Sequence, residues 1–211
     1  MVAVTEKLSE VRRILDRYIV EVVEHYDLCP WARPARLAGE VGIEVLWGEP
    51  APAVWIAAAH SALGQPGARI AMVVAPESAM TPGELRSVRG DVTTGVPGTG
   101  VAHFHPEAEA DLASPARLVP FLRRSPDPLL QIVPLALLES IRGTNVVPDA
   151  LLQAQMLGGT APAMRGDVAD MIAEANHTRV SAELAAVTAT LDAIAADRRE
   201  SYSRAGIRSS R

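Results

Sequence analysis

The sequence contains a single cysteine, Cys29, so no disulfide bond can form within the chain. A chain without disulfide bonds fits a reducing compartment, and we predict a cytoplasmic protein. The first residues lack the charged and then apolar pattern of a signal peptide. The most apolar run, residues 128–141, is too short to span a bilayer and contains Pro134, so we expect no membrane partner.

Basic residues are in the minority. The chain has 20 Lys and Arg residues against 25 Asp and Glu residues, which gives a net charge of -5. This balance argues against a general nucleic-acid-binding protein, which needs a basic surface. Hydrophobic residues make up 48% of the chain, enough to bury a core, so the composition excludes a disordered protein.

Apolar residues recur with the periods of helices and strands in alternation. Spacings of three and four predict an amphipathic helix over residues 5–26. Short β-branched or alternating runs predict four strands, at residues 41–47, 69–75, 101–105 and 129–133. Helical segments follow these strands, at residues 53–64, from 81, from 115, and 134–143. The pattern predicts an α/β or α+β fold with one four-stranded sheet layered with helices.

Two further segments have patterns of their own. The glycine-rich residues 90–100 lack the spacing of a phosphate-binding loop, so we predict a flexible connection or lid there. Near the C-terminus, apolar residues step by four and three in a heptad seam: Val180, Leu184, Val187, Leu191 and Ile194. The seam packs on its own chain or pairs with a second copy in a homodimer. We expect an α/β domain over 1–145, a helical extension over 146–200, and a mobile tail over 201–211.

Cys29 follows the first predicted helix directly and precedes Pro30. A thiol beside a helix end and cationic neighbours can become a thiolate, which is a nucleophile or a metal ligand. Arg33 and Arg36 are the nearby cations. The alternative is a small, inert, buried cysteine, because free cysteine is among the most buried residue types.

His103 and His105 lie two residues apart in a predicted strand, so their side chains share one face while Phe104 faces the core. Two imidazoles on one face form half of a site for zinc, copper or iron, with Cys29, Asp111 or Glu107 as the third ligand. A Cys-Pro pair also ligates haem, which is the less favoured cofactor here. The alternative is a pair of partly exposed histidines at a strand end.

Three separated motifs, DLCPWA, HFHPE and RRSPDPLLQIV, together resemble the DUF1415 domain family of bacterial proteins over about residues 10–142. The matching positions are Leu28, Cys29, Pro30, Trp31, Ala32, Phe104, His105, Pro106, Arg124, Ser125, Pro126 and Pro128. The chain departs from the family at Arg123, where a polar residue is usual, and at Asp127, where an aromatic residue is usual. His103 lies outside the family motif, which favours Cys29 and His105 as the metal ligands.

The resemblance implies that Cys29, His105 and Arg124 meet in a cleft at the strand ends, as thiolate, general base and anion clamp. Three functions follow. The first is a small enzyme that acts on an acidic or phosphorylated small molecule by thiolate addition or acyl transfer. The second is a metal-binding protein with Cys29, His103 and His105 as ligands. The third is a non-catalytic protein that dimerises or docks through its C-terminal helix.

Overall fold

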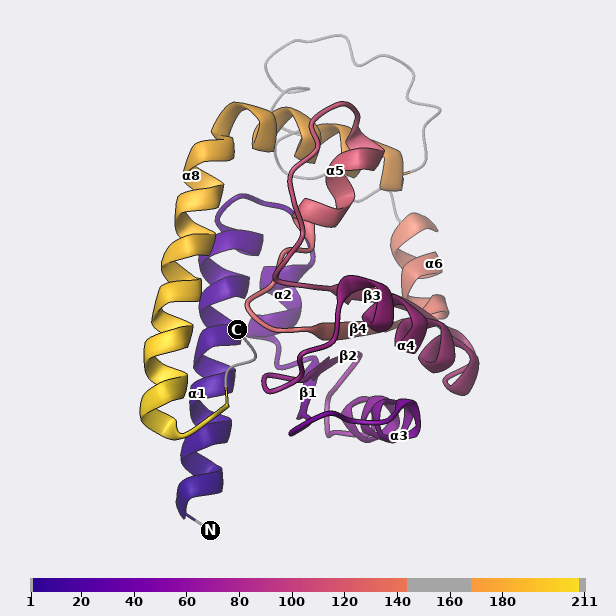
Figure 1. Cartoon of the computed structure of the whole chain (residues 1–211). Coiled ribbons are helices and arrows are strands. Elements are labelled where there is room, and N and C mark those ends of the chain that lie inside the picture. Colours follow the sequence, from indigo (N-terminus) through magenta and orange to yellow (C-terminus); the bar gives the residue numbers. More distant parts are fainter. Residues whose placement is uncertain (1, 144–167, 209–211) are drawn as a thin grey trace, which may run out of the picture.

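The computed structural model describes residues 2–143 and 168–208, and in this part the predicted alternation of strands and helices is confirmed (Figure 1). The four strands are β1 (Val41–Val45), β2 (Ile70–Val74), β3 (Thr99–Phe104) and β4 (Leu129–Pro134). They form one sheet in the order β1-β2-β4-β3. β1 is parallel to β2, whereas β4 runs antiparallel to both of its neighbours, so the fold is α/β with a mixed sheet.

The helices precede, separate and follow the strands. They are α1 (Val2–Tyr18), η1 (Ile19–Glu24), α2 (Ala32–Leu37), α3 (Pro52–Leu63), α4 (Pro82–Gly95), α5 (Pro115–Leu122), α6 (Leu135–Gly143) and α8 (Val168–Ala205). Thr81 and Glu84 form a reciprocal capping box at the start of α4, and the Ser114 hydroxyl caps α5. Of the helices in the described residues, none has both the length and the apolar character that crossing a membrane requires.

The prediction of a flexible connection over residues 90–100 is wrong for its first half, because α4 continues through Gly95. Val88 and Val92 lie one helical turn apart and are both buried against the sheet. The hydroxyl of Thr93 donates to the Arg89 carbonyl one turn earlier, which satisfies it within the helix. Burial of the valine face therefore overrides the poor helix propensity of the glycines and threonines.

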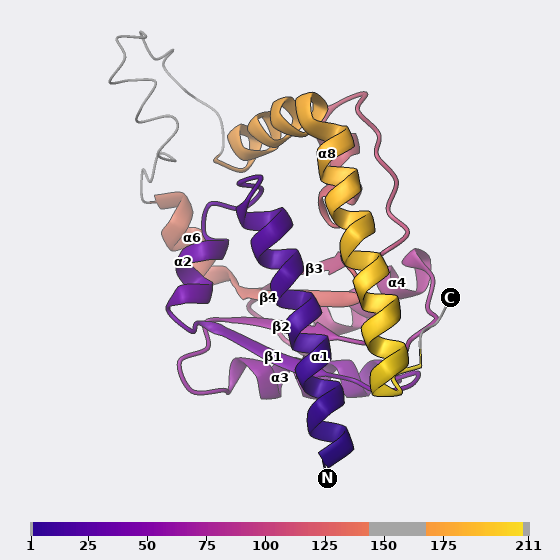
Figure 2. The ribbon, with the colours of Figure 1, turned by 90° about the vertical axis from the view of Figure 1, so that its left-hand side faces the viewer.

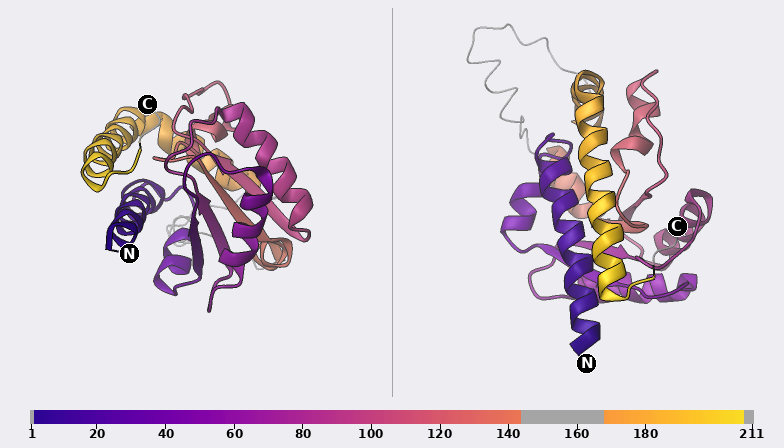
Figure 3. Two further views of the ribbon diagram at one scale, coloured as in Figure 1. Left: turned by 60° about the horizontal axis from the view of Figure 1, so that its bottom comes forward. Right: turned by 60° about the vertical axis from the view of Figure 1, so that its left-hand side comes forward.

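Helices cover both faces of the sheet. Figure 3 shows α3 and α4 on one side and α1 and α8 on the other. Trp55 and Leu85 fill the core on the first side with alanines of α3, and Ile14 and Leu118 belong to the core on the second. The cavity described below lies on this second side.

α8 is one long helix with a bend at Glu183, where the backbone leaves the helical conformation (φ -117°, ψ 17°). The part after the bend runs beside α1 (Figures 1 and 2). The part before it, called the arm below, reaches across to α5. Of the heptad seam, Val180, Val187 and Ile194 are at most 1% exposed, so the seam packs on its own chain. The first part of the predicted extension, residues 146–167, lies outside the described residues.

A buried ion pair fastens the C-terminal end of α8 to the loop before β4. Arg198 Nε donates to Asp127 Oδ1 at 2.6 Å, and the Tyr202 hydroxyl donates to Asp127 Oδ2 at 2.7 Å. Arg198 Nη2 also donates to the Pro76 carbonyl at 2.9 Å, after β2. Asp127 is 1% exposed, so Arg198 and Tyr202 stabilise its negative charge in place of water. Asp127 is therefore an anchor of the fold.

Candidate functional site

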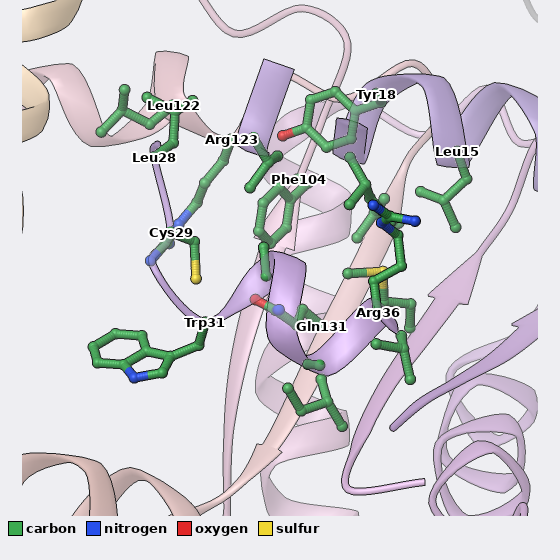
Figure 4. A pocket seen from close by; sticks show the side chains of 18 of the residues that line it. Leu15, Tyr18, Leu28, Cys29, Trp31, Arg36, Phe104, Leu122, Arg123 and Gln131 are labelled. Carbon is green, nitrogen blue, oxygen red and sulfur yellow. The ribbon is translucent and has the colours of Figure 1, made fainter. Parts of the chain in front are cut away.

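A cavity of about 400 Å³ lies between the sheet and the helices on its α1 side (Figure 4). Its walls come from α1, η1, α2, α5, the arm of α8 and strands of the sheet, and are mainly apolar. They include Leu15, Ile19, Val23, Leu28, Ala35, Val41, Ile70, Met72, Phe104, Val119, Leu122, Leu129 and Ile172. The volume is within the range of small-molecule sites, which are typically apolar with a few placed polar groups.

The chain reaches Cys29 through a tight segment that the arm of α8 holds. η1 is a π-helix. After it, the backbone turns at Asp27 (φ 48°), and the Leu28 N–H bonds back to the Val23 carbonyl. Asn176 Nδ2 donates to the Leu28 carbonyl at 2.9 Å. Arg179 donates to the carbonyl of Asp27 at 2.9 Å and to its carboxylate at 3.2 Å. The turn at Asp27, which follows the end of η1 at Glu24, is thus fixed by contacts from a distant helix.

Cys29 lines the cavity, but its surroundings do not favour a thiolate. Burial raises the pKa of the Cys29 thiol above its ordinary value. Hydrogen bonds from the backbone N–H groups of Trp31 and Ala32 lower that pKa, but they only partly offset burial. The thiol is consequently neutral at neutral pH and a weak nucleophile.

The two arginines expected to activate Cys29, Arg33 and Arg36, do not provide a free positive charge beside the thiol. Arg36 lines the cavity, but its guanidinium forms a paired contact with the Glu24 carboxylate at 2.6 and 2.9 Å. This contact holds the pKa of Glu24 below its ordinary value and balances the charge of Arg36. Arg33 is exposed on α2. Neither supplies an uncompensated positive field to the thiol.

We predict that iodoacetamide alkylates Cys29 at neutral pH about tenfold or more slowly than it alkylates free N-acetylcysteine, because only the thiolate reacts. The rate should continue to rise with pH beyond the ordinary pKa of a thiol, since burial raises the pKa of Cys29. Intact-mass spectrometry over time measures both rates, and urea-unfolded protein is the control. Alkylation faster than the free thiol would contradict this and favour the thiolate nucleophile.

His105 is a structural residue in this fold. It is 6% exposed, its Nε2 bonds to the Met80 carbonyl at 2.9 Å, and its Nδ1 accepts from the Glu107 N–H at 3.1 Å. The first contact requires Nε2 to carry the proton and the second requires Nδ1 to be bare, so both nitrogens are occupied. His105 does not line the cavity that contains Cys29.

His103 lies on the other side of β3 from Phe104, which lines the cavity. Burial lowers the pKa of His103, and neighbouring arginines, Arg123 first among them, lower it further. In the described part of the chain, no three or more His, Cys, Asp or Glu residues are grouped so that they could hold a metal. The structure therefore gives the metal set of Cys29, His103 and His105 no support.

The side chains of the two neighbouring arginines in the RRSPDP motif have different surroundings. Arg124, the expected anion clamp, donates to the Pro106 carbonyl and to Asp192 Oδ1, both at 3.2 Å, and is not in the cavity wall. Arg123 lines the cavity instead, with its guanidinium 6.0 Å from the centre of the Phe104 ring. Among the described residues, no carboxylate forms an ion pair with Arg123.

The charge of Arg123 is partly buried, and no carboxylate in the described part of the chain pairs with it. Burial lowers the pKa of Arg123, and the positive charge of Arg89 lowers it further. The guanidinium still stays protonated, because arginine does not lose its proton in proteins. Burial raises the pKa of Tyr18 in the same wall, and the charge of Arg123 partly offsets this rise. The buried Tyr18 hydroxyl has no hydrogen-bond partner among the residues described.

Sequence reasoning identified Cys29 but missed Arg123, Tyr18 and Gln131 as residues of the cavity. Tyr18 belongs to the apolar stripe of the first helix and gave no other signal. Gln131 did leave a signal, because it is the polar residue on one face of an apolar strand, between Leu129 and Val133.

The chain matches no protein-family model, no curated protein and no solved structure with which it was compared. The resemblance to the DUF1415 family therefore depends on the three motifs alone and stays a prediction. The site has to be interpreted from its own geometry.

Proposed function

We propose that this protein binds a small amphipathic anion, a carboxylate with an apolar body, in the cavity between the sheet and α1. The observation that carries the proposal is the guanidinium of Arg123, a cation without a carboxylate partner among the described residues, in the wall of an otherwise apolar cavity. The proposal keeps the small anionic ligand that the sequence led us to expect, but Arg123, not Arg124, is the residue that binds its charge.

The anionic head follows from the energetics of Arg123. A partly buried charge without a counter-charge loses solvation, and an incoming carboxylate compensates that loss through paired N–H···O contacts. Hydrogen bonds to charged groups contribute about 1.5–3 kcal/mol each. The lone hydroxyl of Tyr18 is a second donor close enough to interact with Arg123. Together the two residues favour an anion over a neutral molecule of the same shape.

The apolar body follows from the remaining wall. Leucine, isoleucine, valine and methionine side chains from four helices, the loop at Leu28 and the sheet surround the space. Each methylene that moves from water into such a site contributes about 0.8 kcal/mol. A medium-chain fatty acid or a substituted aromatic acid has this combination of one charged end and one apolar end.

Binding is favoured over thiolate catalysis by the groups around Cys29. The thiol is neutral, and the expected general base, His105, is bonded to backbone groups away from the cavity. A thiolate mechanism needs a base within hydrogen-bond reach of the thiol. We therefore propose a carrier or sensor of the anion in which Cys29 forms part of the wall.

Isothermal titration calorimetry with octanoate and octan-1-ol tests the proposal. Wild-type protein should bind octanoate, and Arg123→Gln should weaken this binding by about 10- to 100-fold, as expected for the loss of a charged contact. Arg124→Gln is the matched control and should bind octanoate as the wild type does, since Arg124 lies outside the cavity.

Octan-1-ol has the same apolar chain as octanoate but no charge, so comparing the two affinities measures the contribution of the carboxylate. The affinity of octan-1-ol should be weaker than that of octanoate in the wild type and unchanged in Arg123→Gln. The proposal would be wrong if Arg123→Gln and Arg124→Gln bound octanoate equally well, or if wild-type protein bound neither compound.

A further inference from the structure

Gln131 is a polar residue of β4 in the part of the cavity wall, called the floor below, that the sheet forms. In the register of the sheet it pairs with Met72 of β2 and Ala102 of β3, and Met72 pairs in turn with Ile43 of β1. The row that crosses the sheet is thus apolar except at Gln131. Its neighbours on the same face of β4, Leu129 and Val133, are also apolar. An amide at this position is unfavourable for packing and needs another explanation.

The amide of Gln131 forms no hydrogen bond with any residue that the structure describes, although the residue is only partly exposed. Gln65 provides the comparison. Its Nε2 donates to the Ile43 carbonyl at 3.1 Å, and its Oε1 accepts from the Ile43 N–H at 3.2 Å. Gln65 therefore has a structural role at β1, whereas the donor and acceptor of Gln131 are both left for whatever occupies the cavity.

Gln131 and Arg123 enter the cavity from different elements. Gln131 comes from β4, and Arg123 follows the last residue of α5, as Figure 4 shows. A purely apolar chain that reached from Arg123 across the floor would displace water from the amide and leave it unpaired. An unpaired polar group of this kind is unfavourable by about 1–3 kcal/mol. A ligand with an oxygen at the right carbon avoids that loss.

We infer that the natural ligand carries a hydroxyl or carbonyl group on its apolar body, and that Gln131 is the residue that selects it. The inference rests on the proposed function and narrows the ligand to oxygenated amphipathic acids. An amide both donates and accepts, so it can serve a hydroxyl or a carbonyl. A site built to bond a ligand oxygen discriminates strongly against an analogue that lacks it.

The test is a calorimetric series with octanoate and its hydroxylated forms, each with one hydroxyl at a successive carbon. Wild-type protein should bind at least one isomer about tenfold tighter than octanoate, the gain from one well-placed hydrogen bond. Gln131→Leu should lose that preference and bind octanoate at least as tightly as the wild type. Gln65→Leu is the control, which should keep the preference for the same isomer.

The outcomes separate this inference from the proposal beneath it. If octanoate binds in an Arg123-dependent manner but no isomer is preferred, or if Gln131→Leu keeps the preference, the inference is overturned and the proposed function stands. If neither octanoate nor any isomer binds to wild-type protein, both fail. A merely structural Gln131 would change the stability of the variant without changing the ratio of the two affinities.

Discussion

Replacing Asp127 with asparagine should lower the free energy of unfolding by about 3–5 kcal/mol, the loss expected when one partner of a buried ion pair is removed. Arg198 is 7% exposed and has its Nε on Asp127 at 2.6 Å, so the variant removes the carboxylate that faces this buried positive charge. The Tyr202 hydroxyl loses its charged acceptor in the same change. These contacts join α8 to the loop before β4, so the whole helix should be affected.

Urea denaturation followed by circular dichroism measures the Asp127→Asn effect. Asp192→Asn is the matched control, because Asp192 is 61% exposed and pairs with Arg124 at 3.2 Å on the surface. The loss of an exposed pair should lower stability by less than about 1 kcal/mol. Equal, small losses in the two variants would show that the Asp127 cluster does not anchor α8.

Gly42→Ala should destabilise the protein by about 3 kcal/mol, at the upper end of the usual range for an overpacked core. Gly42 is buried in β1 beneath α3, and a Cβ atom there would lie 2.0 Å from the carbonyl oxygen of Ala62. The obstacle is backbone, which cannot rotate away as a side chain does. α3 would have to move off the sheet, with loss of contacts around Trp55 and Ala59.

The control for Gly42→Ala is Gly90→Ala in α4, where nothing lies within 4 Å of the new Cβ atom. This substitution should stabilise the protein by about 0.5–1 kcal/mol, because glycine is a poor helix former. Denaturation midpoints of the two variants should therefore move in opposite directions. A Gly42→Ala midpoint at or above that of the wild type would contradict the close approach of α3 to β1.

Local pattern was enough to predict most of the fold. The alternation of apolar residues placed all four strands, and the Thr81 and Ser114 caps placed the starts of two helices. The strand order was not predictable, because the pairing partners of β4 are chosen by packing over long distances. The heptad seam of α8 was visible in the sequence, but an apolar stripe does not say whether its partner is α1 or a second copy.

The site was less predictable than the fold, because it depends on side-chain directions. Arg123 and Arg124 are neighbours with the same chemistry, and only the backbone at the end of α5 sends one to the cavity and the other to Asp192. His105 was expected to be a base because the resemblance places it at a strand end, where clefts form. Its contacts with Met80 and Glu107, which occupy both nitrogens, are formed by backbone groups that no motif identifies.

Asp127 shows the opposite case, a residue whose signal was present but had no interpretation. It stood out as a charged residue between two prolines where the resemblance led us to expect an aromatic one. Its partners, Arg198 and Tyr202, lie more than 70 residues further along the chain. A buried charge can be suspected from sequence, but its counter-charge is found only in the folded structure.

The most direct test of the central claim is a crystal structure of the protein with octanoate bound. The account predicts that the ligand occupies the cavity, with its carboxylate within hydrogen-bond distance of the Arg123 guanidinium and its chain along the floor toward Gln131. Octanoate elsewhere on the protein, or in the cavity with its carboxylate turned away from Arg123, would contradict the account.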